Sequence, residues 1–182
     1  MLQITTDHQY DNAVSLCRKI FIQKTKDYGT SWRVYRPISI ADQIYIKAKR
    51  IRNIQEKRMQ KIADDIKGEF IGIFNYGIIG LIQLELPGEE PEELNEQEAI
   101  SFYDEKKSLA KKLMENKNHD YGEAWRDMAQ ESFTDLILAK VLRIKQIIKN
   151  EGRTGISEGI DSNYIDIVNY AAFALILSEE NN

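Results

Sequence analysis

Two segments of this chain repeat each other, and the duplication limits the possible folds more than any other feature of the sequence. With a shift of 93 positions, residues 10–56 align with residues 103–149 at 18 identical positions, far more than chance gives. The most distinctive shared motif, Asp-Tyr-Gly-x-x-Trp-Arg, begins at Asp27 in the first copy and at Asp120 in the second. The second copy contains one additional residue after this aligned window, so that the later parts of the two copies align with a shift of 94. One structural unit is therefore present twice.

A segment rich in glutamate and proline separates the two copies. Residues 87–96 read Pro-Gly-Glu-Glu-Pro-Glu-Glu-Leu-Asn-Glu, a composition typical of a solvated linker. We therefore divide the chain into a first repeat over residues 1–86, an acidic linker over residues 87–101 and a second repeat over residues 102–182.

Each copy is predicted to contain three helices. Apolar residues recur at helical spacing in the first segment, which should end near the motif glycine. The second helix is expected to begin with Ser39 or Ser132 as N-cap and to run to about Gln60 or Asn150. Residues 70–84 alone could form a strand, but the corresponding segment of the second copy is long and alanine-rich, which favours a helix in both. We predict one all-α domain with pseudo-twofold symmetry, in which the two third helices pack together.

Composition excludes several classes of protein. A net charge of -4 argues against a duplex nucleic-acid binder, which usually has a basic surplus. The single cysteine, Cys17, allows no internal disulfide, and the first ten residues do not resemble a secretory signal, so we expect a cytoplasmic protein. The most apolar run, residues 70–84, is too short for a membrane span. A homodimer is possible if part of the repeat interface stays exposed.

The shared turn motif could present rings and a cation to a ligand. Its candidate binding residues are Asp27, Tyr28, Trp32 and Arg33 in the first copy and Asp120, Tyr121, Trp125 and Arg126 in the second. Aromatic rings can stack on a base, and an arginine can hold a phosphate. A structural interpretation competes, because tryptophan buries a large area and Asp-x-Gly often only forms a turn. We favour the structural role for the tryptophan and leave both open for the aspartate and the arginine.

The second helix repeats a pair of cations three residues apart, Lys47 and Arg50 in the first copy and Lys140 and Arg143 in the second. This spacing places both side chains on one helix face, where they could hold a phosphate. The alternative is a solvated face whose charges form ion pairs.

The third helix of the second copy carries Asp166, Asn169 and Tyr170 on one face. With Glu158 and Asp161 just upstream, Asp166 could bind Mg²⁺ and act as the catalytic group. Alternatively, the upstream acids cap the helix and Asp166 pairs with an arginine. In the first copy Asn75 and Tyr76 are retained as candidate ligand residues, but Gly72 replaces the aspartate.

These motifs, Lys-Asn-His-Asp-Tyr-Gly-Glu-Ala-Trp-Arg, the Lys/Arg helix and Asp-x-x-Asn-Tyr, resemble the nucleotide-modification-associated domain 1 family of bacteria and phages, over nearly the whole chain. The resemblance implies nucleotide metabolism or base modification. The family's third-helix pattern is matched by Glu158, Asp166, Asn169 and Tyr170, whereas Ser162 and Gly72 depart from it. The layout is more loosely similar to all-α nucleoside triphosphate pyrophosphohydrolases. Those enzymes hold Mg²⁺ with two acidic elements on neighbouring helices. Glu158 and Asp161 fit one of these elements, and the other is missing from this chain.

Three functional hypotheses follow. The first is a Mg²⁺-dependent enzyme that acts on a nucleotide phosphate. The second is a nucleotide-binding or regulatory module without catalysis, which needs the cations but not the carboxylates. The third is a scaffold in which the motif residues only pack.

Overall fold

The computed structural model describes residues 5–57, 63–86, 93–155 and 159–181, and every regular element within these ranges is helical. The six α-helices are α1 (Thr6–Tyr28), α2 (Pro37–Lys57), α3 (Ala63–Glu85), α4 (Glu96–Tyr121), α5 (Gln130–Lys149) and α6 (Ile160–Glu180). A short 3-10 helix follows the glycine of each shared motif, at Ser31–Val34 and Ala124–Asp127. The predicted all-α fold is confirmed, and residues 70–84 are helical rather than a strand.

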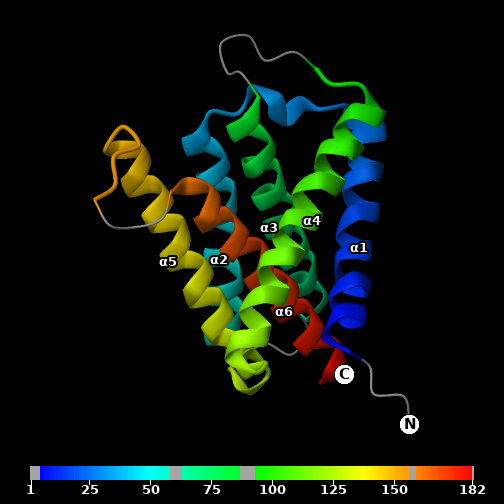
Figure 1. Cartoon of the computed structure of the whole chain (residues 1–182), viewed down its shortest axis with the longest axis vertical. Helices are drawn as coiled ribbons and strands as arrows, with labels where there is room; N and C mark the ends of the chain where they lie inside the picture. The colour runs from blue at the N-terminus through cyan, green and yellow to red at the C-terminus, as the bar shows by residue number, and fades with distance from the viewer. Residues whose placement is uncertain (1–4, 58–62, 87–92, 156–158, 182) are drawn as a thin grey trace.

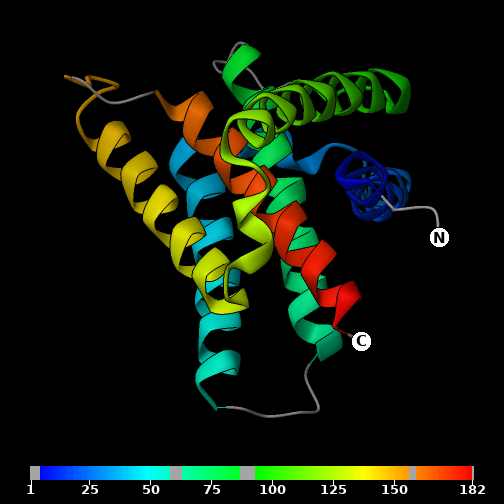
Figure 2. The same cartoon turned by 60° about the horizontal axis from the view of Figure 1, so that its bottom comes forward.

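The third helices of the two repeats, α3 and α6, form the centre of the molecule and pack against each other, as predicted (Figure 1). Helix α2 packs on α3 and α5 on α6 in the same way, and α2 and α5 also contact each other. Helices α1 and α4 lie side by side against the central pair (Figure 2). None of the described helices combines the length and apolar composition that a membrane-spanning segment requires.

Ion pairs between α1 and α4 show the twofold relation between the repeats. Arg18 Nε lies 2.7 Å from Asp104 Oδ1, and Lys111 Nζ lies 2.9 Å from Asp11 Oδ1. Because Lys111 and Asp104 are the counterparts of Arg18 and Asp11 in the repeat, one contact is made twice in opposite directions. Partly exposed pairs of this kind each contribute up to about 1 kcal/mol, so they fix the register more than the stability.

The contact between α2 and α5 has the same symmetry. Arg52 on α2 lies 3.6 Å from Asp135 on α5, and Lys145 on α5 lies 2.5 Å from Asp42 on α2. Lys145 is the counterpart of Arg52, and Asp135 that of Asp42. The aspartates that follow the start of each second helix therefore join the two repeats.

Two buried hydrogen bonds connect the first helix of each repeat to the third helix of the other. The Tyr10 hydroxyl donates to Asn169 Oδ1 at 2.8 Å, and the Tyr103 hydroxyl donates to Asn75 Oδ1 at 2.7 Å. Burial raises the pKa of both phenols well above its usual value, so both hydroxyls stay protonated and can donate.

The two asparagines also bind the first helix of their own repeat. Asn75 Nδ2 donates to the carbonyl of Cys17 at 3.0 Å, and Asn169 Nδ2 donates to the carbonyl of Ala110 at 3.1 Å. Cys17 and Ala110 are again counterparts. Each asparagine therefore joins three helices from both repeats through one buried amide.

Two glycines allow α3 to approach α6 closely. A Cβ on Gly77 would lie 2.6 Å from Val168 Cγ2, and a Cβ on Gly80 would lie 2.6 Å from the Tyr164 ring. These distances are too short for real contacts, so the packing requires glycine at both positions. Gly72 instead lies against the side chain of Lys47 on α2.

The second helices begin near the predicted positions, but the predicted serine N-caps are wrong. Helix α2 begins at Pro37, and α5 begins after Ala129, so Ser39 and Ser132 lie within the first turn. Proline suits the first helical position because its φ is already fixed and its missing N–H has no helical partner there. Ala129 adopts the extended conformation of an N-cap residue but makes no side-chain hydrogen bond. Alanine is not a preferred N-cap residue, so the sequence does not indicate this helix start.

The remaining boundaries agree with the sequence to different degrees. Helices α1 and α4 end at the motif glycines, Gly29 and Gly122, which both have positive φ. Helix α5 ends beside the expected Asn150, whereas Gln60 lies outside the described residues. Asn95 and Glu98 form a capping box that starts α4 at Glu96, so the last residues assigned to the acidic linker are helical.

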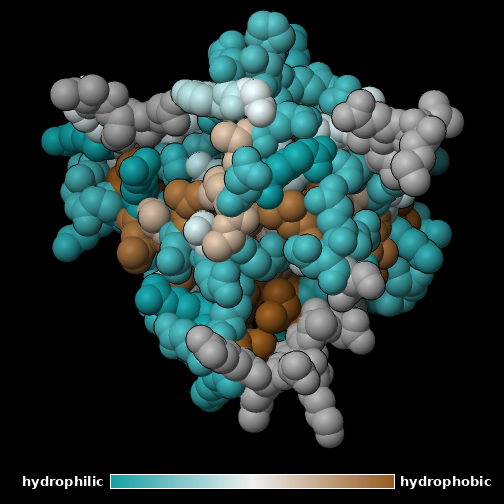
Figure 3. Space-filling model, turned by 90° about the horizontal axis from the view of Figure 1, so that it is seen from below, coloured by the Kyte–Doolittle hydropathy of each residue, from teal (hydrophilic) through white to brown (hydrophobic). Residues whose placement is uncertain are grey.

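Large apolar side chains are exposed on several elements of the surface. They belong to Tyr28, Val34, Ile38, Ile46, Leu84, Leu109, Tyr121 and Leu142. On the face seen from below, apolar side chains lie between mainly hydrophilic ones (Figure 3). Nothing in a single chain identifies a partner for these side chains, so the homodimer stays a prediction.

The buried tyrosine–asparagine bonds give a stability prediction. Tyr10→Phe and Tyr103→Phe should each lower the free energy of unfolding by about 1–3 kcal/mol, because each leaves a buried asparagine oxygen without its donor. The two losses should be similar, since the two bonds are equivalent. Tyr28→Phe is the control: its ring is exposed, and it should change stability by less than about 0.5 kcal/mol. Urea unfolding measures all three, and wild-type stability in both buried variants would contradict the symmetric arrangement.

Candidate functional site

A cavity of about 270 Å³ opens in the first repeat, beside the Asp-Tyr-Gly turn and between α1, α2 and α3. It brings together five of the predicted ligand residues of this repeat: Tyr28, Trp32, Lys47, Asn75 and Tyr76. Lys24, Tyr35 and Gly72 also line it. Segments far apart in the sequence therefore meet at one concave site.

The aromatic side of the cavity consists of rings from the turn and from α3. The rings of Tyr35 and Tyr76 lie 6.3 Å apart at an interplanar angle of 28°. Burial, and then a hydrogen bond with Tyr35, raises the pKa of Tyr76 to about 12, so this phenol is neutral. Trp32 is buried and packs near Phe21, which agrees with a mainly structural role, whereas the Tyr28 ring is 72% exposed. These rings offer a planar ligand apolar faces beside hydroxyl groups.

The cavity is also lined by two lysines, Lys24 and Lys47. Lys24 is exposed, and within the described part of the chain its ammonium forms no ion pair. Lys47 Nζ lies 3.4 Å from Glu69 and 5.9 Å from the centre of the Tyr76 ring. A Cβ on Gly72 would lie 3.0 Å from Lys47 Cδ, so the lysine stem passes directly over this glycine.

The second repeat places a carboxylate where the first has Gly72. Asp166 on α6 is 7% exposed; its Oδ1 lies 2.8 Å from Lys117 Nζ and its Oδ2 lies 2.7 Å from Lys140 Nζ. Lys117 and Lys140 are the counterparts of Lys24 and Lys47. Burial alone would raise the pKa of Asp166, but the two lysines outweigh it and the pKa lies below its usual value. The expected partner of Asp166 was an arginine; two lysines take that place.

Lys24 and Lys117 were absent from the candidates drawn from the sequence. The signal was present, because both lysines are identical positions of the repeat and each precedes the Asp-Tyr-Gly motif by three residues. Helical spacing then directs them to the same side as the motif.

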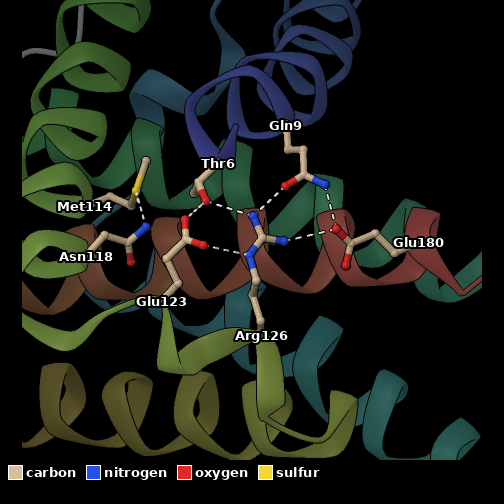
Figure 4. A network of polar contacts seen from close by, with 7 residues as sticks. All are labelled: Thr6, Gln9, Met114, Asn118, Glu123, Arg126 and Glu180. Atoms are coloured by element: carbon tan, nitrogen blue, oxygen red, sulfur yellow. Dashed lines mark hydrogen bonds and ion pairs between the residues drawn. The ribbon is translucent and has the colours of Figure 1, made fainter. Parts of the chain in front are cut away.

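The arginine of the second motif holds the turn to α1 of the other repeat (Figure 4). Arg126 forms ion pairs of 3.0 Å with both Glu123 and Glu180. Its Nη2 also donates to Thr6 at 2.8 Å and to Gln9 at 2.6 Å. All these contacts join parts of the chain to one another, so they account for Arg126 without a ligand.

The other residues of the Trp-Arg pairs are also held by the protein. Arg33 is buried and donates to Gln83 Oε1, while Gln83 Nε2 donates to the Arg33 carbonyl at 3.1 Å. Trp125 is buried and stacks on Phe173, with ring centres 4.3 Å apart. In both repeats, the tryptophan and the arginine of the motif are therefore held by packing and hydrogen-bond contacts with the rest of the protein.

The remaining predicted residues lie nearer the surface. Arg50 pairs with Glu69, which also binds Lys47, whereas Arg143 is exposed. Of the two motif aspartates, Asp27 accepts a hydrogen bond from Gln23, and Asp120 lies 3.4 Å from His119. Of the two tyrosines, Tyr121 is exposed, and Tyr170 is half-buried beside Phe133. None of Asp27, Arg33 and Arg50 lines the cavity of the first repeat.

The predicted magnesium ligands are not assembled among the described residues. Glu158 lies outside them, Asp161 is exposed in the first turn of α6, and Asp166 is held by two ammonium groups. The described part of the chain contains no group of three His, Cys, Asp or Glu side chains that could hold a metal. A cation at Asp166 would meet two like charges, so the described acidic residues do not fit a magnesium centre in this arrangement. The role of Glu158 stays a prediction.

The buried ion pairs of Asp166 predict a stability loss that depends on pH. Asp166→Asn should lower the free energy of unfolding by about 1–3 kcal/mol at neutral pH, since Lys140 loses a buried charged partner. Folding lowers the pKa of the Asp166 carboxyl, so its ion pairs stabilise the folded protein fully above the pKa of unfolded aspartate, about 3.9. This stabilisation is lost as the pH falls through the lower pKa of the folded state. The difference from wild type should therefore shrink in strong acid.

Asp11→Asn is the matched control, because it breaks the exposed ion pair with Lys111 and should cost less than about 1 kcal/mol. Chemical unfolding at neutral and at acidic pH measures both variants. An Asp166→Asn variant with wild-type stability at neutral pH, or with the same deficit in strong acid, would show that the ion pairs do not act as described.

Comparison with known proteins identifies a family. The model described as nucleotide modification associated domain 1 matches twice, over residues 24–84 and 117–177. No curated protein and no solved structure matches the chain. The two matches begin at Lys24 and Lys117 and include the turn motif, the Lys/Arg helix and the Asn-Tyr pair of each repeat. Because they cover more than half of the chain, the protein belongs to the nucleotide modification associated domain 1 family and carries this domain in duplicate.

Proposed function

We propose that the cavity of the first repeat binds a nucleotide. The observation that carries this proposal is the combination of two lysines and several aromatic rings around one cavity. Ammonium groups bind phosphate oxygens through charge-assisted hydrogen bonds, and aromatic rings stack on bases. The family description, nucleotide modification, refers to the same class of molecule without giving an activity.

The size of the cavity limits the ligand. A volume of about 270 Å³ is close to the lower end, about 300 Å³, of typical small-molecule sites. A mononucleotide suits this size better than a dinucleotide. Its phosphate would lie at Lys24 and Lys47, and its base would lie against Tyr35 and Tyr76, whose rings line the same cavity.

The residues around the cavity favour binding without hydrolysis in the first repeat. None of its described lining residues carries a carboxylate, and Tyr76 is a neutral phenol whose pKa is raised to about 12. Glu69, near Lys47, is already paired with two cations. We therefore propose a nucleotide-binding or regulatory module, and the Mg²⁺-dependent hydrolase is the alternative that the next experiment separates from it.

The experiment uses tryptophan fluorescence as a local reporter. The chain has two tryptophans, of which Trp32 lines the cavity, so a Trp125→Phe background reports from the cavity alone. Mononucleotides should change this fluorescence without Mg²⁺, and Lys24→Met should weaken binding by about tenfold or more, since it removes a charge-assisted contact. Lys19→Met is the control, because Lys19 is an exposed lysine of the same helix that does not line the cavity.

Each outcome has a defined meaning. Binding that requires Mg²⁺ and yields a hydrolysed product would support the hydrolase instead of the binding module. Equal weakening by Lys24→Met and Lys19→Met would indicate a general charge effect and contradict the proposed phosphate position. The absence of binding by any mononucleotide would reject the nucleotide proposal and favour the scaffold.

A further inference from the structure

The two repeats contain the same set of charges around equivalent positions, arranged differently. Among the described side chains, the first has Lys24, Lys47 and Arg50 with the carboxylate of Glu69. The second has Lys117, Lys140 and Arg143 with one carboxylate, Asp166. The position of the carboxylate is therefore the difference between them.

In the second repeat the carboxylate lies between the two lysines. Asp166 bridges Lys117 and Lys140 with one oxygen to each, at 2.8 and 2.7 Å. The first and second helices of a repeat can thus direct both lysines at a single anionic group placed over the third helix. This geometry is that of a small anion site whose anion is part of the chain.

In the first repeat the carboxylate is displaced by one helical turn. Glu69 precedes Gly72 by three residues, binds Lys47 and Arg50, and does not line the cavity. Gly72 supplies no side chain at the position of Asp166, and Gly68 one turn earlier also lines the cavity. No carboxylate therefore lies between Lys24 and Lys47 among the lining residues of the cavity, and the Lys47 stem packs over Gly72.

We propose that Asp166 occupies in the second repeat the place at which the first repeat binds the anionic group of its ligand, so that the chain has one anion site, between Lys24 and Lys47 over Gly72. This inference rests on the proposed function for the nature of the whole ligand, but the anion site itself concerns only a phosphate-like group. The duplication has produced one open copy and one copy closed by its own carboxylate.

Exchanging the two residues tests the inference, with inorganic phosphate as the probe and isothermal titration calorimetry as the measurement. Wild-type protein should bind one phosphate per chain. Gly72→Asp should abolish this binding, because the new carboxylate takes both lysines. Gly72→Ala is the control: it adds a Cβ without a charge, near the flexible end of Lys47, and should keep the site.

The reverse exchange should open the second repeat. Asp166→Gly should bind two phosphates per chain, and phosphate should raise its melting temperature more than that of wild type, since the anion replaces the lost partner of Lys140. The Gly72→Asp/Asp166→Gly double variant should again bind one. If Asp166→Gly is too unstable to purify, Gly72→Asp and Gly72→Ala decide the question by themselves.

The inference is overturned if wild type binds no phosphate or two per chain, or if Gly72→Asp binds phosphate as wild type does. Its failure is distinct from failure of the nucleotide proposal. Phosphate binding lost in Gly72→Asp, with no mononucleotide binding more tightly than phosphate, supports the anion site and rejects the nucleotide. Nucleotide binding that Gly72→Asp leaves unchanged supports the nucleotide and rejects the anion site.

Discussion

The arrangement of this protein depends on two buried asparagines, Asn75 and Asn169. Each accepts a hydrogen bond from a tyrosine of the opposite repeat and donates one to a carbonyl of its own first helix. A buried amide left without partners is costly, so these bonds favour the one packing in which all are satisfied. In this packing the first, second and third helices of the first repeat surround a cavity. The amide that fixes the helices also lines that cavity, so fold and site share a residue.

The same scaffold carries two different electrostatic arrangements. In both repeats a lysine from the first helix and a lysine from the second helix face the same position on the third helix. An aspartate there makes a closed cluster of ion pairs, whereas a glycine leaves positive charge beside a cavity. The two copies therefore differ in where the carboxylate lies, and under the proposed function this difference separates a structural copy from a binding copy.

The sequence predicted the elements well because the two copies could be compared. The alanine-rich third helix of the second repeat identified residues 70–84 as a helix, and the glycines of the shared motif marked the ends of α1 and α4. The N-caps predicted at Ser39 and Ser132 were wrong, because α2 begins at Pro37 and α5 begins after an extended Ala129 without a side-chain cap bond. The site was harder to predict. The amides of Asn75 and Asn169 are used by tyrosines distant in sequence, and only tertiary structure shows that Lys117 reaches the third helix of its repeat and that Lys24 lines a cavity together with the third helix of its own.

The most direct test of this account is a crystal structure of the protein with a heavy oxyanion, such as selenate, located by its anomalous scattering. The account predicts one strong peak in the first repeat, between Lys24 and Lys47 and above Gly72, and no peak beside Asp166, whose carboxylate already holds the corresponding lysines. Equal peaks in both repeats, or an anion bound only away from the cavity, would contradict the claim that the two copies differ in this way.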